Sequence, residues 1–284
     1  MPCIATGVVR WARPDWCAPS GTHWPPERPG RRAPVADDLL TADALAAAID
    51  AQGSPERAAA SARFFRAVPG GYGAGDVFVG VPVPVTRTLV RRAARMPVRE
   101  AGLLLASPVH EHRLAALLLL VDRYRRATRT RTRDDAERNA LHARYLDAVR
   151  AGWVNGWDLV DSSAPWLVGD WLMGPPAHDV AAVLDPLAAS AVLWQRRTAM
   201  LATFAFTMAG DPGPALVYAR RLLEDEEDLV RKAVGWMLRE VGKRADMGAL
   251  LAFLQEHAAR MPRITLSYAT EHLDPDERAR LRRL

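Results

Sequence analysis

The 284-residue sequence contains little cysteine and no long apolar run. Its two cysteines, Cys3 and Cys17, both lie near the start, which excludes a disulfide framework and a cysteine-rich metal site and indicates a reducing, cytoplasmic compartment. The longest apolar run, Leu114 to Val121, is far shorter than the roughly 20 residues that cross a bilayer. Residues 1–20 hold no uninterrupted apolar segment, so a signal peptide is not expected.

The charge balance is only modestly basic, with 38 Lys and Arg against 33 Asp and Glu and a net charge of +5. This balance permits nucleic acid as a partner without requiring it. Residues 1–36 are rich in proline, glycine and arginine and have no periodicity, which is typical of a flexible basic arm. Residues 37–284 are expected to form a separate folded domain.

From Thr41 onward the pattern is helical, with short connections and no convincing strand. Thr41 and the run Ser54-Pro55-Glu56 carry residue types that start helices, whereas residues 69–83 form the one long non-helical stretch. Helices are expected over residues 42–49, from the start at Ser54-Pro55-Glu56, and near residues 84–95, 97–106, 109–127, 132–151, 166–174, 179–188, 190–208, 213–223, 227–242, 246–260, 264–272 and 275–283. Breaks are expected at Gly174–Pro176, Asp211–Gly213 and Met261–Pro262.

This pattern predicts an all-α protein. Helix pairs recur about every 35–45 residues, which favours a curved α-solenoid of HEAT-like helical repeats with an extended concave surface. A compact helical bundle is the competing architecture. The solenoid is preferred because no heptad array spans the chain.

The segment Trp153–Pro165 concentrates aromatic and acidic residues in a chain dominated by Ala, Leu, Val and Arg. Trp157 and Asp161 are four residues apart, so a helix would place them on one face. An aromatic ring beside a carboxylate is a suitable environment for a cation. The alternative is a tryptophan that packs in the core, with Asp158 and Asp161 as helix caps or surface charges.

The segment 229–244 predicts an amphipathic helix with two opposed stripes. One stripe, at a spacing typical of a core-facing surface, consists of Val230, Val234, Met237 and Val241. The other, displaced by two residues, consists of Lys232, Trp236, Arg239 and Lys243. Cations around an aromatic ring are expected of a surface that contacts phosphates and sugars or bases. A solvated face whose tryptophan a neighbouring repeat covers remains the alternative.

Arg197 shares a stripe with Leu193, Met200 and Phe204. Because arginine stays charged when buried, Arg197 needs an anionic partner. Phosphate, Asp158 and Asp161 are all candidates, so spacing leaves both a DNA contact and an internal ion pair open. Arg196 points elsewhere and is expected to face solvent.

Two further motifs do not support a site. His110-Glu111-His112 has the composition of a metal site, but residues two apart on a helix do not face each other, so no metal is expected there. Gly70–Gly75 lacks the strand and helix context of a nucleotide-binding loop.

Taken together, the motifs resemble those of the AlkD-type DNA glycosylases, which are DNA alkylation repair enzymes. The resemblance covers about residues 40–284 and depends mainly on Trp157-Asp-Leu-Val-Asp161, Leu193-Trp-Gln-Arg-Arg197 and Lys232-Ala-Val-Gly-Trp236-Met-Leu-Arg239. It is supported by Gly75–Pro82 and Ser107–Glu111. It implies a solenoid of HEAT-like repeats that holds duplex DNA on a basic concave face and needs no metal or cofactor.

The resemblance also implies a reaction and a set of roles. The family excises N3- and N7-alkylated purines, such as 3-methyladenine and 7-methylguanine, by hydrolysing the N-glycosidic bond. Asp161 matches the catalytic carboxylate, and Trp157 and Trp236 match the two aromatics around the deoxyribose. Arg197 and Arg239 match arginines that contact DNA, to which the two-stripe pattern adds Lys232 and Lys243. Phe64 departs from the family, since some relatives have a tyrosine near this position.

A monomeric, monofunctional alkylpurine-DNA glycosylase is therefore the preferred hypothesis. Its partner would be double-stranded DNA that carries alkylated purines, with no membrane or metal involved. The alternative is a non-catalytic HEAT-repeat module that binds DNA structures or protein partners. The sequence leaves the preferred adduct open, between small methyl lesions and bulky natural-product adducts.

Overall fold

A computed structural model describes residues 39–175 and 178–284 of the chain. The arm predicted for residues 1–36 lies outside these ranges. The described residues are helical throughout, apart from their connections, and contain no strand. A single isolated parallel bridge joins Val77, in the predicted non-helical stretch 69–83, to Val109. The all-α prediction is confirmed.

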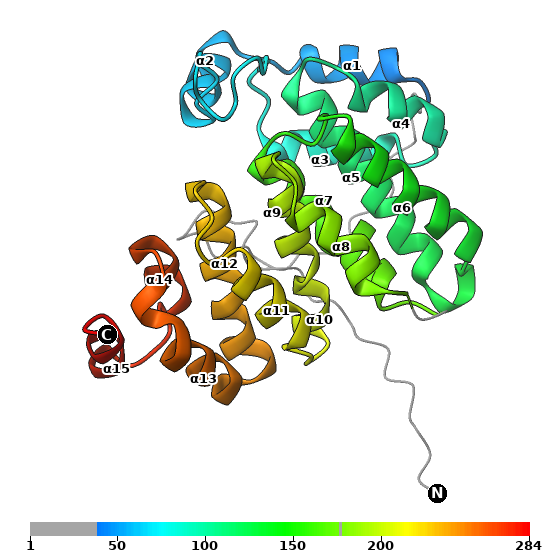
Figure 1. Ribbon diagram of the computed structural model, residues 1–284. Helices are drawn as coiled ribbons and strands as arrows, with labels where there is room; N and C mark the ends of the chain where they lie inside the picture. Colours follow the sequence, from blue (N-terminus) through cyan, green and yellow to red (C-terminus); the bar gives the residue numbers. More distant parts are fainter. Residues whose placement is uncertain (1–38, 176–177) are drawn as a thin grey trace, which may run out of the picture. The chain divides into compact units, whose positions relative to one another are not determined.

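The helices follow one another with short connections (Figure 1). The α-helices are α1 (Ala42–Asp50), α2 (Pro55–Phe64), α3 (Val83–Arg92), α4 (Val98–Leu105), α5 (His110–Thr128), α6 (Asp135–Arg150), α7 (Trp157–Ala164), α8 (Val180–Ala188), α9 (Leu193–Ala202), α10 (Phe204–Met208), α11 (Gly213–Arg221), α12 (Asp228–Glu240), α13 (Met247–His257), α14 (Arg263–Ala269) and α15 (Pro275–Leu281). Short 3-10 turns are η2 (Thr130–Thr132) and η5 (Ala258–Arg260), and π-helical turns are η3 (Pro165–Asp170) and η4 (Val241–Ala245).

The helices pack as two layers that lie against each other. In the first layer α3, α5, α7, α9, α12 and α14 each pack against the next, and in the second α4 and α6 cover α5, α8 covers α9, and α11 covers α12. This repeated pairing, visible from top to bottom in Figure 1, is that of a HEAT-like α-solenoid. It brings α7, α9 and α12, which carry the predicted site residues, together as consecutive members of one layer.

Local sequence signals explain where most helices begin. The side chains of Thr41 and Ser54 accept hydrogen bonds from the first turns of α1 and α2, as predicted. Asp134 and Asp246 cap α6 and α13 in the same way. The predicted breaks at Asp211–Gly213 and Met261–Pro262 are confirmed, because α11 and α14 begin directly after each proline turn.

Two predicted boundaries are wrong. The single helix expected over residues 190–208 is divided at Thr203, whose hydroxyl donates to the carbonyl of Met200 at 2.7 Å and competes with the backbone ladder. A new helix was expected after Pro165, but α7 continues through this proline as the π-helical turn η3. The wider π turn tolerates a residue without a backbone N–H, where an α-helix would be interrupted.

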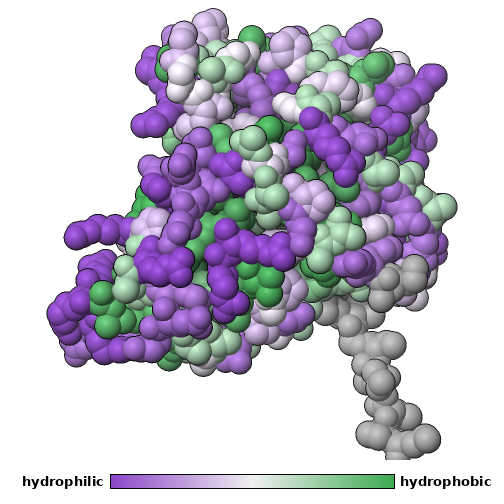
Figure 2. Space-filling model, in the orientation of Figure 1, coloured by the Kyte–Doolittle hydropathy of each residue, from purple (hydrophilic) through white to green (hydrophobic). Residues whose placement is uncertain are grey.

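The core is built from leucine, valine and alanine side chains on the facing sides of these layers. Figure 2 shows hydrophilic side chains over most of one face, with apolar side chains reaching the surface around α9 and α12. Within the described ranges, the helices include none that is both long and apolar enough to cross a membrane.

Gly80 lies in the connection before α3, in a conformation and a space that only glycine fits. Gly80 has φ +79°, and a Cβ added there would lie 2.4 Å from both the Ala58 nitrogen and the Ser54 oxygen. Gly70 has a similar φ of +81° but open space around it. We expect Gly70→Ala to cost about 1–2 kcal/mol from the left-handed backbone alone, and Gly80→Ala to cost about 1–3 kcal/mol more from overlap.

Urea unfolding of the two variants beside the unmodified protein measures this difference through the midpoints at constant m. Equal losses of stability in both variants would contradict the close packing of Gly80 against α2.

Candidate active site

Asp161 and Arg197 form a buried ion pair between α7 and α9. Arg197 donates from Nε to Oδ1 of Asp161 at 2.9 Å and from Nη2 to Oδ2 at 2.8 Å. The two side chains are only 5% and 6% exposed, for Asp161 and Arg197 respectively. Such a two-pronged contact fixes the orientation of the carboxylate as well as its position. Of the three anionic partners that the sequence left open for Arg197, the structure provides Asp161.

Arg197 also reaches the next helix of the layer. Its Nη1 donates to the backbone carbonyl of Leu229 in the first turn of α12. Since α9 packs against both α7 and α12, one guanidinium joins all three helices at the depth of the Asp161 carboxylate. A buried charge is tolerated only when it is paired and hydrogen-bonded in this way.

Burial raises the pKa of Asp161 above the usual aspartate value, and the ion pair with Arg197 offsets that rise only in part. The charge of Asp158 nearby raises the pKa of Asp161 further. An unpaired carboxylate in this position would take up a proton. The ionised form of Asp161 therefore depends on Arg197.

A second buried carboxylate, Glu240, organises the end of α12. It accepts hydrogen bonds from the indole Nε1 of Trp236 at 3.2 Å, from Arg239 at 3.0 Å and from Arg244. Burial by itself would raise the pKa of Glu240, but the hydrogen bonds and charges of Arg244 and Arg239 outweigh it, and the pKa is lowered. Glu240 thus stays ionised and holds the half-buried Trp236 ring in a fixed orientation.

Trp157 lies at the first position of α7, one turn before Asp161, as the spacing predicted. Its half-buried ring stacks on Phe65 with centroids 5.4 Å apart, and Phe64 meets it edge-on at 6.0 Å. Phe64 itself is 66% exposed. These contacts make Trp157 the inner member of an aromatic group whose outer member faces solvent.

The remaining cations differ in how they are engaged. Arg239 bonds to Glu271 as well as to Glu240, so its charge is already balanced by carboxylates. Lys232 is half-buried and Lys243 is exposed, and neither side chain bonds to any residue within the described ranges. These are the only two lysines of the sequence. The apolar stripe opposite them is fully buried, as predicted.

Arg196, which was expected to face solvent, is instead partly buried and paired with a carboxylate. It bonds to both carboxylate oxygens of Asp225, at 2.6 and 3.1 Å, and the two side chains are 15% and 5% exposed. The expectation was wrong because helix periodicity does not reveal that the acidic run before α12 folds back onto α9. The adjacent arginines therefore form two comparable ion pairs, of which only that of Arg197 involves α7, the helix that carries Trp157.

The N-terminal turn of α7 is anchored by a buried histidine, His110, which the sequence analysis considered only as a metal ligand. His110 bonds through Nδ1 to Asp76 at 2.9 Å and through Nε2 to Asp158 at 2.8 Å. Arg113 and Asn155 also donate to Asp76. Burial alone would lower the pKa of His110, but Asp158 and Asp76 outweigh it and raise the pKa to about 9. A protonated imidazole thus bridges α5, α7 and the loop before α3.

The neighbours of His110 have separate partners. Glu111 accepts from the backbone nitrogens of Gly80 and Val79 at 2.8 and 3.2 Å, and His112 bonds to Asp50 at 2.9 Å. No group of three or more His, Cys, Asp or Glu that could hold a metal ion occurs in the part of the chain that the structure describes.

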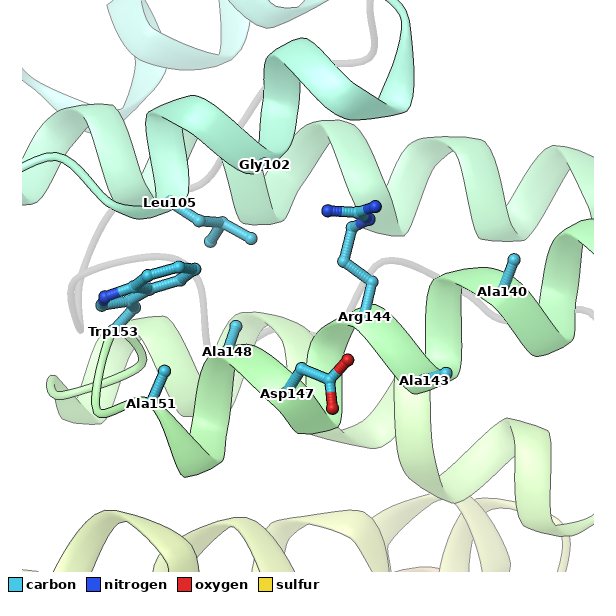
Figure 3. Close-up of a pocket in the computed structure, with 9 residues that line it drawn as sticks. All are labelled: Gly102, Leu105, Ala140, Ala143, Arg144, Asp147, Ala148, Ala151 and Trp153. Atoms are coloured by element: carbon cyan, nitrogen blue, oxygen red, sulfur yellow. The ribbon is translucent and has the colours of Figure 1, made fainter.

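A groove with a volume of about 400 Å³ lies between α4 and α6. Leu105 and the 40% exposed Trp153 face each other at one end, and Arg144 extends toward Gly102 (Figure 3). None of the residues that the sequence predicted for the site lines this groove. The chemistry-bearing residues meet instead at the junction of α7, α9 and α12.

Comparison with known families shows to which family the chain that forms this junction belongs. The model of the DNA alkylation repair enzyme family matches residues 45–273, which include every residue of the junction. The chain belongs to the DNA alkylation repair enzyme family. A solved structure described as a predicted DNA alkylation repair enzyme from Enterococcus faecalis has the same fold, with a TM-score of 0.59 and 18% identity over 79% of this chain and 98% of that one. No curated protein matches the sequence.

In this DNA alkylation repair enzyme, the predicted residues Trp157, Asp161, Arg197 and Trp236 lie on three consecutive helices of one layer. Sequence reasoning missed the contacts that His110, Asp76 and Glu240 make in the site. The signal that could have found Glu240 is its position four residues after Trp236, which places both on one face of α12. Nothing in the local sequence connects His110 with Asp76 or Asp158.

The pairing of His110 predicts how stability depends on pH. Its folded pKa of about 9 exceeds the usual 6.5, so the folded chain binds more protons than the unfolded chain between these values. Its contribution is complete below pH 6.5 and is lost as the pH rises toward 9, by about 3 kcal/mol in total. We expect His110→Gln to remove this decline when unfolding free energies are measured by urea titration from pH 6 to 9.5.

His142 is the matched control, because its pKa is shifted in the opposite direction. Burial lowers the pKa of His142 to about 4, so its contribution is complete above pH 6.5 and is lost as the pH falls toward 4. His142→Gln should therefore change only the acid side of the profile. A decline above pH 6.5 that persists in His110→Gln would show that another group titrates there.

Proposed function

We propose that this repair enzyme is a monofunctional alkylpurine-DNA glycosylase. It hydrolyses the N-glycosidic bond of cationic N3- and N7-alkylated purines in duplex DNA and leaves an abasic site. Residues 37–284 form the glycosylase domain, residues 1–36 form an arm, and the enzyme acts as a monomer. The observation that carries the proposal is the buried Asp161 carboxylate, which Arg197 holds ionised between the helices that carry Trp157 and Trp236.

The chemistry fits a carboxylate and needs only water as co-substrate. An alkylated purine of this type carries a positive charge, so the electron pair of the broken C1′–N bond neutralises the departing base. The sugar becomes oxocarbenium-like, with positive charge at C1′, as in other sugar hydrolyses. The Asp161 carboxylate stabilises this charge and orients the water that adds to C1′ and loses a proton.

The two tryptophans supplement the carboxylate. The π face of an indole attracts a cation by about 0.5–2 kcal/mol where water is excluded. Trp157 is supported from behind by Phe65, and Trp236 is oriented by its bond to Glu240. Contributions of this size suffice for a base that leaves readily, which restricts the substrates to cationic lesions.

The cations proposed to contact DNA differ in the internal bonds that they would have to give up or share. Lys232 and Lys243 have no partner to give up among the described residues, so they bind phosphate at least cost. Arg239 would exchange its bond to the half-exposed Glu271 for a phosphate. Arg197 would share its guanidinium between Asp161 and a phosphate, because Nε and both Nη atoms already bond within the protein.

The central test replaces the carboxylate by an amide. We expect Asp161→Asn to lower the release of 7-methylguanine and 3-methyladenine from methylated duplex DNA by at least about 100-fold. Released bases are measured by mass spectrometry under single-turnover conditions.

Asp225→Asn is the matched control for this test. The side chain of Asp225 is as little exposed as that of Asp161 and pairs with the neighbouring, partly buried Arg196, so both variants lose an ion pair that is shielded from water, at up to about 3–5 kcal/mol. Normal base release by Asp225→Asn with loss in Asp161→Asn assigns the effect to chemistry rather than to folding. Release at the unmodified rate by a folded Asp161→Asn would remove Asp161 from the mechanism.

The lysine content offers a direct test of the DNA interface. Since Lys232 and Lys243 are the only lysines of the chain, amine-specific acetylation followed by peptide mass spectrometry reports on these two side chains. We expect duplex DNA to reduce acetylation of both several-fold at low salt, and less at high salt because phosphate contacts weaken. The N-terminal amine serves as an internal reference. Equal acetylation with and without DNA would place the interface elsewhere.

A further inference from the structure

Two segments of the chain hold an unusual share of its positive charge. Residues 87–99 and 123–133 together contain eleven arginines and neither aspartate nor glutamate, whereas the whole chain has a net charge of only +5. The first segment runs from α3 into the start of α4, and the second from the end of α5 through η2. Outside these segments the chain is therefore acidic on balance.

The fold brings the two segments together. Arg126 donates to the backbone carbonyl of Ala94 at 3.0 Å, and Arg123 donates to that of Met96 at 3.3 Å. The end of α5 thus lies directly against the connection between α3 and α4. We name the surface formed by residues 87–99 and 123–133 the α3–α5 arginine surface.

Several of these arginines are engaged within the protein, but three exposed ones are not. Arg123 pairs with Glu137, Arg133 with Asp135, and Arg125 lies over the ring of Trp166. In the part of the chain that the structure describes, no side chain bonds to the exposed side chains of Arg92, Arg129 and Arg131.

Helix dipoles explain only part of this clustering. Arg91, Arg92, Arg125 and Arg126 lie in the last turns of α3 and α5, where positive charge is favourable. That effect does not extend to Arg129 and Arg131, which follow the end of α5. Like charges gathered on one surface repel each other and retain counterions, and release of those counterions favours binding to a polyanion.

The α3–α5 arginine surface is separate from the candidate active site. His110, at the start of α5, bonds to Asp158 beside Trp157. Arg123 lies thirteen residues later on the same helix, which corresponds to about 20 Å along its axis. The two regions are therefore at opposite ends of α5.

We propose that the α3–α5 arginine surface binds the phosphate backbone of duplex DNA outside the candidate active site, independently of sequence and of damage. The choice of DNA rests on membership of a DNA alkylation repair family and not on the glycosylase reaction. Guanidinium groups match phosphate geometry in pairs, and contacts of this kind hold a protein on undamaged DNA while carrying no sequence information. This surface raises the affinity for the DNA in which a lesion must be found.

The test uses the full chain and an undamaged duplex of about 30 base pairs. The variant Arg92→Gln/Arg129→Gln removes one cation from each segment, and Arg282→Gln/Arg283→Gln, at the exposed end of α15, removes the same charge elsewhere. We expect the first variant to bind more weakly and to lower the slope of log K against log salt concentration by about 2, since each phosphate contact contributes about 0.9. The second should retain the slope of the unmodified protein.

The outcomes separate this proposal from the glycosylase proposal, because the binding measurement needs no base release. An unchanged slope in Arg92→Gln/Arg129→Gln overturns the proposal, as does an equal decrease in both variants. The proposal is also overturned if Arg92→Gln/Arg129→Gln loses affinity for duplex RNA but keeps the affinity of the unmodified protein for duplex DNA. Where base release is measured, saturating amounts of Arg92→Gln/Arg129→Gln should act at the unmodified single-turnover rate, because the surface does not contact the reacting sugar.

Discussion

The pairing of Arg197 with Asp161 is the constraint on which the site depends. A buried carboxylate is stable only beside a buried cation, and a buried guanidinium needs acceptors for its remaining nitrogens. Arg197 meets both demands by bonding to Asp161 on α7 and to the Leu229 carbonyl on α12 from its own position on α9. The stacking of three consecutive helices is thereby fixed at the point where the carboxylate lies. A change in the spacing of these helices would therefore alter the ionisation of Asp161 as well as its position.

The two buried carboxylates of this region have different environments. Glu240 has two arginines and an indole N–H as partners, and its pKa is lowered despite burial. Asp161 has one arginine, and its pKa is raised. A carboxylate whose charge is fully compensated serves as an anchor, in this case for Trp236. One that is only partly compensated retains electrostatic attraction for a further cation, and perturbed groups of this kind are typical of functional sites. The same difference supports the proposal that Asp161, rather than Glu240, stabilises a developing positive charge.

The periodicity of the sequence predicted which faces of the helices are buried. It could not predict which residues pair across long stretches of the chain. The spacing of Val230, Val234 and Met237 was enough to assign the buried stripe of α12. The apolar neighbours of Arg197 showed that it needs an anion, but the choice between phosphate and an aspartate depends on a contact across 36 residues. The hydrogen bond from His110 to Asp158 joins residues 48 positions apart, and no local sequence pattern indicates it. The π-helical turn through Pro165 was missed for another reason, since tertiary packing there overrides the preference of proline to end a helix.

The distribution of cations has a consequence for DNA binding. Arginines beside the two buried carboxylates are paired internally, Arg197 with Asp161 and both Arg239 and Arg244 with Glu240. These pairs prevent the carboxylates from repelling phosphates, but they leave little net positive charge to attract DNA. In the proposals above, attraction comes from cations that carboxylates do not neutralise, among them Lys232 in α12, Lys243 in η4 and the exposed Arg92, Arg129 and Arg131 of the α3–α5 arginine surface. Under the two proposals these tasks are separate, since the site responds to the positive charge of a damaged nucleotide while the α3–α5 arginine surface supplies binding energy for ordinary duplex.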